Sequence, residues 1–363
     1  MSLFSPSKIS MPDFILPGCI ALYGFFLRCR MLAGRDLWGD EVFQFNNSAG
    51  PFKPFWGHYN YCDLTSFPGE YLLTYPFIQT FGLNKWGLAI PHILLTVWGY
   101  YLLYRLCKRF FPTSGGTIIT FLVVSLNYNL TYHAFEFRPY AVLPVLAVGA
   151  LYFADLIINR FDELKTITKV GIGIFFILTA VYHAYGILIV FLPLVFIFLL
   201  NRHEGRTGGD KETRRYYLIG ILGVATALWS WYASSNCFGL TSNLGFYNAK
   251  NTFRYIPNPL TAPVGFLKGI IGNLIGFKPL YFLLAGPVLA VFIRSRARIA
   301  QAAFLFLMVI LPIALILFVD LRSQYWFLQR QFVWVMPYFA FFLGWTWDTL
   351  FIWRKRRHSY NSS

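Results

Sequence analysis

The chain has 363 residues, of which 57% are hydrophobic, 20% aromatic and only 13% charged, and its mean hydropathy is +0.53. A soluble globular chain has roughly half apolar and about a quarter charged residues, so this composition excludes a water-soluble enzyme with a single core. We attribute the net charge of +16 to orientation in a membrane and contact with anionic lipid, not to nucleic acid. The scattered cysteines have neither metal-ligand nor disulfide-framework spacing.

Apolar runs long enough to cross a bilayer follow one another along the chain. We expect membrane-spanning helices near 13–30, 86–106, 116–131, 139–158, 169–184, 186–201, 216–234, 279–294, 299–319 and 331–351. The apolar stretches 68–82 and 263–277 are expected to be interfacial or re-entrant, since a crossing at 68–82 would move a basic cluster to the opposite side. The predicted fold class is all-α: a multi-pass transmembrane protein of about 10–12 spans with interfacial helices on the outer face.

The basic clusters divide the chain between the two sides of the membrane. Because Lys and Arg concentrate in cytoplasmic loops, we place the basic clusters on the cytoplasmic side, and both termini then lie on that side as well. We predict one integral membrane domain over 1–363, an outer loop at 31–85 that holds an Asp-Glu motif and an interfacial helix, and a basic cytoplasmic tail at 354–363. Arg28 and Arg30, near the end of the first span, are interpreted as anchors to lipid headgroups.

Ionisable side chains near membrane depth gather on the predicted outer face. They include Arg28, Arg30, His133, Glu136, Arg138, His183, Asp320, Arg322 and Arg330, together with Asp40 and Glu41 in the outer loop. Such groups are costly at that depth, which indicates a functional site. Arginine binds phosphate through a planar fork of donors, and a carboxylate can take the proton from an attacking hydroxyl. This combination fits glycosyl transfer from a sugar carried on a lipid phosphate.

Five segments in order resemble the polyprenol-phosphate-sugar-dependent membrane glycosyltransferases of the C-type fold, which include protein O-mannosyltransferases and lipid A aminoarabinose transferases. The segments are LWGDEVFQF, the stretch 66–111 that begins SFPGEYLLTYPF, HAFEFRPYAV, YHAYGILIVFLPL and LQRQFVWVMPYFAFFLGW. The chain departs from the family at FPGEY (67–71), where many members have His-Pro-Pro-Leu-Tyr.

The resemblance implies an inverting transferase that moves a sugar from a polyprenyl-phosphate donor to a hydroxyl of a glycan, lipid or protein acceptor at the outer face. Asp40 is then the general base, and Glu41 binds the acceptor or orients the site. The implied donor phosphate ligands are Arg138, Arg330 and His183, and the implied supporting residues are Glu136, Tyr140 and His133. No metal is assigned or required, although a divalent metal is compatible with the family. The expected location is the bacterial cytoplasmic (inner) membrane.

Simpler roles stay open for the same residues. The Asp-Glu pair could cap an interfacial helix, Arg138 could cap the next span, His183 could be a core histidine, and Arg330 could pair with Asp320. For the whole chain, a lipid-linked-sugar flippase or transporter would use the arginines without needing Asp40. A membrane scaffold would need no ionisable groups converging on one face.

Overall fold

A computed structural model of the chain describes residues 11–49, 69–203, 211–234, 256–291, 296–323 and 329–361. Within these ranges it contains fourteen α-helices, joined by turns and short 3-10 helices, and no β-strand. The predicted all-α fold class is therefore confirmed. Helical structure also lies in every range for which we predicted a span.

The helices in the predicted spans are α1 (Met11–Ala33), α4 (Lys85–Phe110), α5 (Ser114–Leu126), α7 (Leu143–Asn159), α8 (Thr166–Ala180), α9 (Gly186–His203), α10 (Lys211–Ser234), α12 (Ala285–Val291), α13 (Arg296–Ser323) and α14 (Met336–Asn361). Between the predicted spans lie α2 (Gly39–Ser48), α3 (Gly69–Phe81), α11 (Pro263–Ile275) and the 3-10 helix η3 (Phe161–Glu163). At the ends of predicted spans lie α6 (Tyr128–Tyr132) and the 3-10 helices η2 (Pro139–Ala141), η6 (Lys278–Leu284) and η7 (Gln329–Val335).

By length and composition, four of the described helical segments could each cross a membrane. They are Phe14–Ala33, Lys85–Phe110, Pro139–Asn159 and Gln301–Phe318. A fifth candidate is the pair Pro263–Ile275 and Lys278–Ala290, bent by 103° as in a broken span or a re-entrant loop. Three shorter helices, α5, α8 and α9, are also apolar. The total number of crossings stays a prediction.

Some predicted boundaries differ from the structure for local reasons. The run 116–131 is interrupted after Leu126, because the Asn127 side chain accepts the Leu130 N–H and caps α6 while donating to the carbonyl of Leu274. The run 169–184 ends at Ala180, which leaves a turn over 181–185 before α9. The backbone of α14 continues to Asn361, so the described part of the basic tail is helical.

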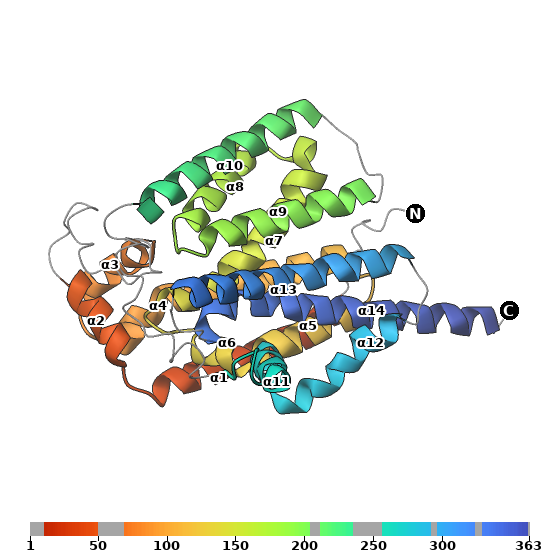
Figure 1. Cartoon of the computed structure of the whole chain (residues 1–363), viewed down its shortest axis with the longest axis horizontal. Helices are drawn as coiled ribbons and strands as arrows, with labels where there is room; N and C mark the ends of the chain where they lie inside the picture. Colours follow the sequence, from red (N-terminus) through yellow and green to blue (C-terminus); the bar gives the residue numbers. More distant parts are fainter. Residues whose placement is uncertain are drawn as a thin grey trace.

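The long helices run roughly alongside one another, with α8, α9 and α10 grouped on one side of the others (Figure 1). α14 packs against α5, α7 and α13, and α7 also packs against α4 and α9. The crossing of α5 and α14 is close because Gly116 and Gly344 meet there: a Cβ at Gly344 would lie 2.1 Å from Thr120 Oγ1. Small residues permit this approach between membrane helices, where packing is the main source of association.

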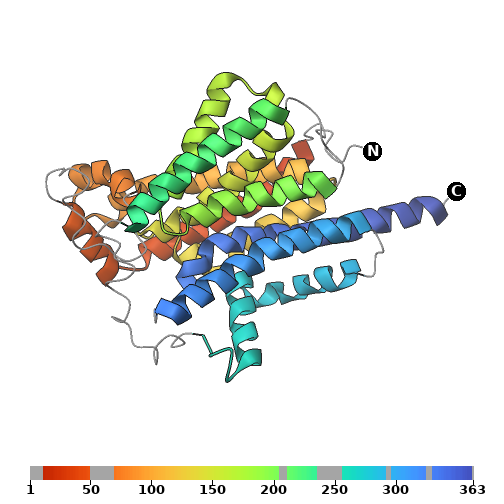
Figure 2. The same ribbon diagram turned by 45° about the horizontal axis from the view of Figure 1, so that its top comes forward.

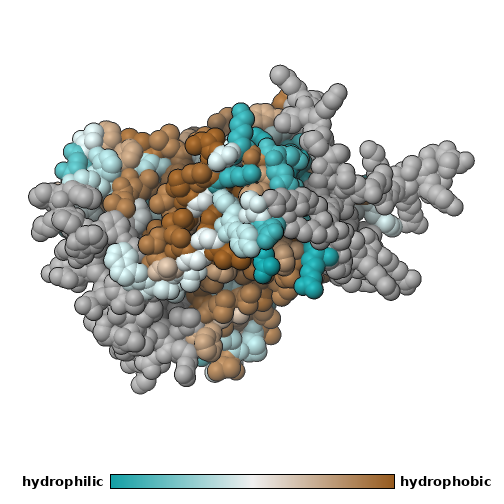
Figure 3. All heavy atoms as spheres, turned by 90° about the horizontal axis from the view of Figure 1, so that it is seen from above, coloured by the Kyte–Doolittle hydropathy of each residue, from teal (hydrophilic) through white to brown (hydrophobic). Residues whose placement is uncertain are grey.

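The outward faces of α8, α9 and α10 are apolar. Exposed side chains include Ile174 and Leu178 on α8, Phe198 on α9, and Ile219 and Trp231 on α10. Figure 3, which looks onto this side of the molecule, shows a hydrophobic surface over the left and centre of the view, with hydrophilic residues gathered mainly to the right of it. Such extensive apolar exposure is typical of a surface that contacts lipid.

One end of the bundle carries the connections that contain the predicted site. α2 and α3 lie at this end, whereas α1 begins and α14 ends at the opposite end (Figures 1 and 2). This separation agrees with the arrangement predicted from charge, in which the termini and the site lie on opposite sides. Which end faces outward stays a prediction.

The interpretation of Arg28 as a headgroup anchor is wrong. Its side chain is buried, donates from Nη1 to the carbonyl of Gly24 at 2.9 Å and from Nη2 to that of Val124 at 2.9 Å, and lies over the ring of Tyr100. The close approach of α1 to α5 at Gly24 brings the guanidinium against α5 carbonyls. Arg28 therefore joins helices inside the bundle.

Candidate active site

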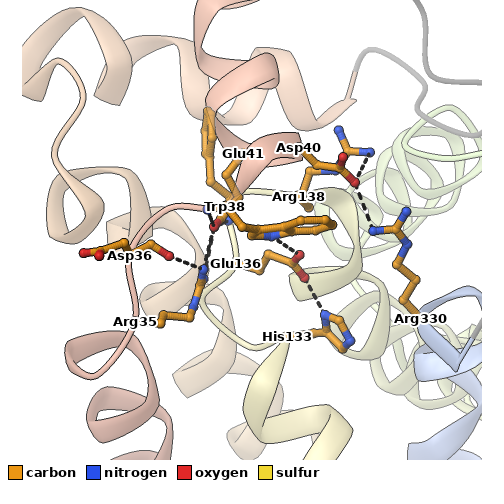
Figure 4. A network of polar contacts seen from close by, with 10 residues as sticks. Arg35, Asp36, Trp38, Asp40, Glu41, His133, Glu136, Arg138 and Arg330 are labelled. Atoms are coloured by element: carbon orange, nitrogen blue, oxygen red, sulfur yellow. Dashed lines mark hydrogen bonds and ion pairs between the residues drawn. The ribbon is translucent and has the colours of Figure 1, made fainter.

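Asp40 and Glu41 lie in the first turn of α2. Carboxylates are favoured there because the first turn of a helix presents unpaired N–H groups and a positive dipole end. Glu41 Oε2 accepts the backbone N–H of Trp38 at 3.1 Å, which caps the helix. Glu41 thus has the simpler helix-capping role in part. Asp40 does not, because its carboxylate points toward Arg138 and Arg330 (Figure 4).

The Glu41 carboxylate is fully buried and has a donor on every side. Oε2 is 2.5 Å from Nη1 of Arg35, and Oε1 is 3.0 Å from Nη2 of the same residue. Oε1 also accepts the backbone N–H of Phe137 at 2.7 Å. Both oxygens are therefore engaged, and Glu41 ties the start of α2 to the loop that carries Arg138. Of the two roles expected for Glu41, this geometry favours orienting the site.

Asp40 faces two arginines from distant parts of the chain. Its Oδ2 accepts a hydrogen bond from Nη1 of Arg330 at 3.0 Å and lies 4.0 Å from Nη2 of Arg138 (Figure 4). The Asp40 side chain is 38% exposed, whereas those of Arg330 and Arg138 are 19% and 2% exposed. Asp40 is thus the most accessible of the three. The Asp320 side chain, an alternative partner for Arg330, lies outside the described residues.

Two aromatic rings fix the position of Arg330. Its guanidinium lies 5.3 Å from the ring centroid of Trp38 and 5.3 Å from that of Tyr140. Such cation–π contacts stabilise a guanidinium by roughly 0.5–2 kcal/mol each and restrict its orientation. The sequence reasoning named Tyr140 but missed Trp38, although the latter stands two residues before Asp40.

Glu136 joins this aromatic contact to His133. One carboxylate oxygen accepts the Trp38 indole N–H at 2.8 Å, and the other is 2.5 Å from Nδ1 of His133. Burial alone would raise the pKa of Glu136, but the hydrogen bond from His133 and the nearby positive charges, including Arg330, hold it below its usual value. Glu136 is therefore a carboxylate that positions Trp38.

His183 lies in the turn between α8 and α9, fully buried beside the Tyr140 ring at 5.8 Å between centroids. Burial, together with the positive charge of Arg138, lowers the pKa of His183 to about 3, so the imidazole is neutral. Its Nδ1 accepts the backbone N–H of Tyr185 at 3.1 Å, which places the proton on Nε2. No hydrogen-bond partner for Nε2 is present among the described residues.

The structure thus brings the predicted site residues to one end of the bundle and adds two that were missed, Arg35 and Trp38. Both stand within six residues of the Asp-Glu pair, which is the signal that could have identified them. Among the described residues, no group of three His, Cys, Asp or Glu side chains has the arrangement of a metal site. Metal dependence stays a prediction.

Comparison with known proteins finds a likeness in structure only. No family model and no curated protein sequence matches the chain. The crystal structure of ArnT from Cupriavidus metallidurans bound to undecaprenyl phosphate matches with a TM-score of 0.59 and 15% sequence identity, over 94% of this chain and 61% of that one. The apo structure of the same protein matches with a TM-score of 0.58 and 15% identity, over 92% and 59%.

This chain therefore spans about three fifths of the length of the ArnT chains. At 15% identity the likeness establishes the fold: this chain has the fold of ArnT. Together with the apolar helices and the apolar outward surface, it identifies an integral membrane protein with the fold of ArnT.

Proposed function

We propose that the chain is an inverting glycosyltransferase that moves a sugar from a polyprenyl-phosphate donor to a hydroxyl at the outer face of a bacterial cytoplasmic membrane. The observation that carries the proposal is the convergence of Arg330 and Arg138 on one oxygen of Asp40, at 3.0 and 4.0 Å. It supports the proposal because arginine binds phosphate well, and here two arginines lie beside a carboxylate that is 38% exposed. The binding of undecaprenyl phosphate by ArnT, which has the same fold, supports the class of donor.

In this mechanism Asp40 takes the proton from the acceptor hydroxyl as its oxygen attacks the anomeric carbon. The bond between that carbon and the phosphate oxygen breaks, and the electron pair leaves with the polyprenyl phosphate. Arg330 and Arg138 stabilise the departing charge, and the neutral Nε2–H of His183 supplies a further donor. Because a phosphate is already a good leaving group, a second carboxyl acting as acid is not needed.

In the structure, Arg330 is hydrogen-bonded to Asp40 itself. The phosphodiester of the bound donor carries one negative charge, like a carboxylate, and presents two oxygens that accept bidentate bonds from guanidinium, so it competes for the same arginines. Donor binding would then release Asp40 to accept a proton. The base becomes available when the leaving group is in place.

The supporting residues hold this geometry. Glu41 fixes the start of α2 against the 136–138 loop, while Glu136 and Trp38 orient Arg330. The proposal leaves the sugar unspecified, and takes the acceptor to be a glycan, lipid or protein.

The test uses proteoliposomes supplied with a mixture of radiolabelled polyprenyl-phosphate sugars. Asp40→Asn should reduce transfer by roughly 10²–10⁴-fold, the usual loss for a missing general base, while binding of undecaprenyl phosphate persists. The matched control is Asp36→Asn, which removes the same charge from an exposed position in the same segment and should transfer normally.

Equal transfer by wild type and Asp40→Asn would remove Asp40 from the mechanism. Movement of donor between leaflets by both proteins, with no transfer by either, would identify a flippase and refute the proposed function.

A further inference from the structure

A second buried polar cluster lies beside the candidate site and takes no part in the proposed mechanism. Its centre is Glu70, in the first turn of α3, whose side chain is fully buried. One carboxylate oxygen accepts a hydrogen bond from the hydroxyl of Tyr182. The other lies 3.0 Å from Nε2 of His92 on α4 and 3.5 Å from Nε2 of Gln44 on α2. Glu70 thus connects α2, α3, α4 and the turn that follows α8.

Burying a carboxylate to join these segments costs desolvation free energy. Within the described residues no Lys or Arg forms an ion pair with Glu70, so its partners are the phenol, an imidazole and an amide. Apolar side chains of similar volume often stabilise a core as well or better than buried charges do. An ionisable group retained in the interior of a membrane protein therefore indicates a functional reason.

The backbone makes the same connection. A Cβ at Gly69, the first residue of α3, would lie 2.7 Å from Cα of Tyr182, closer than real atoms approach. Only glycine allows this contact without displacing the turn. The FPGEY segment, which departs from the family pattern, thus supplies both the glycine that admits Tyr182 and the glutamate that holds its hydroxyl.

Tyr182 immediately precedes His183 in a turn of few residues. On the other side, the Trp229 indole N–H donates to the carbonyl of Ala184 at 2.9 Å, so the turn is held between α10 and Glu70. The His183 Nδ1 is occupied by the Tyr185 N–H, which leaves Nε2–H as a buried donor with no hydrogen-bond partner among the described residues. The direction of that donor depends on where the turn sits.

We propose that Glu70 is a positioning residue for the donor phosphate: through Tyr182 it holds the turn so that Nε2–H of His183 points at the phosphate. This inference rests on the proposed function, in which His183 contacts the donor. Glu70 itself touches neither substrate nor reacting atoms.

The test measures the Kd for undecaprenyl phosphate in detergent micelles and, in proteoliposomes, kcat and the donor KM. Tyr182→Phe removes a single oxygen and keeps the ring, so it is the mildest perturbation. We expect Kd and donor KM to rise about tenfold, with a smaller change in kcat. Glu70→Ala should give a similar rise, and Glu70→Gln, which retains an acceptor oxygen for Tyr182, should restore most of the affinity.

The decisive comparison repeats Tyr182→Phe in a His183→Ala background. If Tyr182 acts through His183, Tyr182→Phe should raise Kd when His183 is present. It should leave Kd unchanged when His183 has been replaced by alanine, because the two residues then act as one unit. Asp155→Asn is the control for loss of a buried carboxylate: Asp155 pairs with Arg109 near the far end of α7, roughly 18 Å along the helix from Leu143. It should leave Kd unchanged.

An equal rise in Kd in both backgrounds, or no rise at all, would overturn the inference while leaving the proposed function intact. A wild-type protein that does not bind undecaprenyl phosphate would refute both.

Discussion

Replacing Glu41 with glutamine tests whether its carboxylate is structural or chemical. The side chain keeps its size, but one oxygen becomes an NH₂ group that donates. Every partner of Glu41 is itself a donor: two nitrogens of Arg35 and the backbone N–H groups of Trp38 and Phe137. The new NH₂ group therefore faces two donors whichever way the amide turns, and two of the four hydrogen bonds are lost.

The expected cost follows from this geometry. A hydrogen bond to a charged group contributes roughly 1.5–3 kcal/mol, and breaking a buried ion pair costs about 3–5 kcal/mol. Because the Arg35 side chain is only 15% exposed, water replaces little of the lost interaction. We expect a loss of about 3–5 kcal/mol, which corresponds to a fall in Tm of roughly 6–10 °C for a chain of this size.

The assay is thermal unfolding of the detergent-solubilised protein, with transfer activity measured at a temperature well below both midpoints. Asp36→Asn serves again as the control and should leave Tm unchanged. A Glu41→Gln variant with the wild-type Tm and no activity would refute the structural reasoning and assign Glu41 to the chemistry.

Three further outcomes follow from the same contacts. The pKa of His183 is about 3 in the folded chain and 6.5 for an unperturbed histidine, so between these pH values the unfolded chain binds more protons than the folded one. The free energy of unfolding should therefore fall by about 1.4 kcal/mol per pH unit as the pH is lowered below 6.5. Measurements of Tm against pH should show this dependence in the wild type and its loss in His183→Gln. Arg330→Lys keeps the charge but loses the planar fork, so the donor KM should rise at least tenfold in the transfer assay, and an unchanged KM would exclude bidentate contact. Gly344→Ala places a methyl group against Thr120 Oγ1 and should destabilise the protein by about 1–3 kcal/mol in thermal unfolding, whereas Gly220→Ala on α10, with no atom within 4 Å, should not.

The positions of the helices could be predicted because a bilayer requires long apolar segments with every backbone group paired internally. The break at Asn127 could not, since it depends on a carbonyl of Leu274 that the chain supplies about 150 residues later. For the same reason Arg28, at the end of an apolar run, was assigned to the lipid surface although α5 provides carbonyls for it.

Within the site, charge and loop position placed Asp40, Arg138 and Arg330 on one face with other ionisable residues, and the resemblance to the family selected these three as candidates. The residues that hold them were not evident, because the Trp38 indole bonds to Glu136 98 residues away and leaves no local pattern. Glu70 was visible only as a departure from the family's sequence. Its partners Tyr182 and His92 are defined by the packing of α3 and α4.

The ion pair between Asp40 and Arg330 joins residues that are 290 positions apart. During synthesis at about 5–20 residues per second, Asp40 leaves the ribosome roughly 15–60 s before its partner. Through that interval the membrane already holds the early helices but not η7 or α14, so the nascent chain has a carboxylate without the arginine that completes the site. On the proposed function, catalytic competence is then acquired in a single late event, the insertion of the last helix, and we expect incompletely made chains in the membrane to be inert toward lipid-linked sugars.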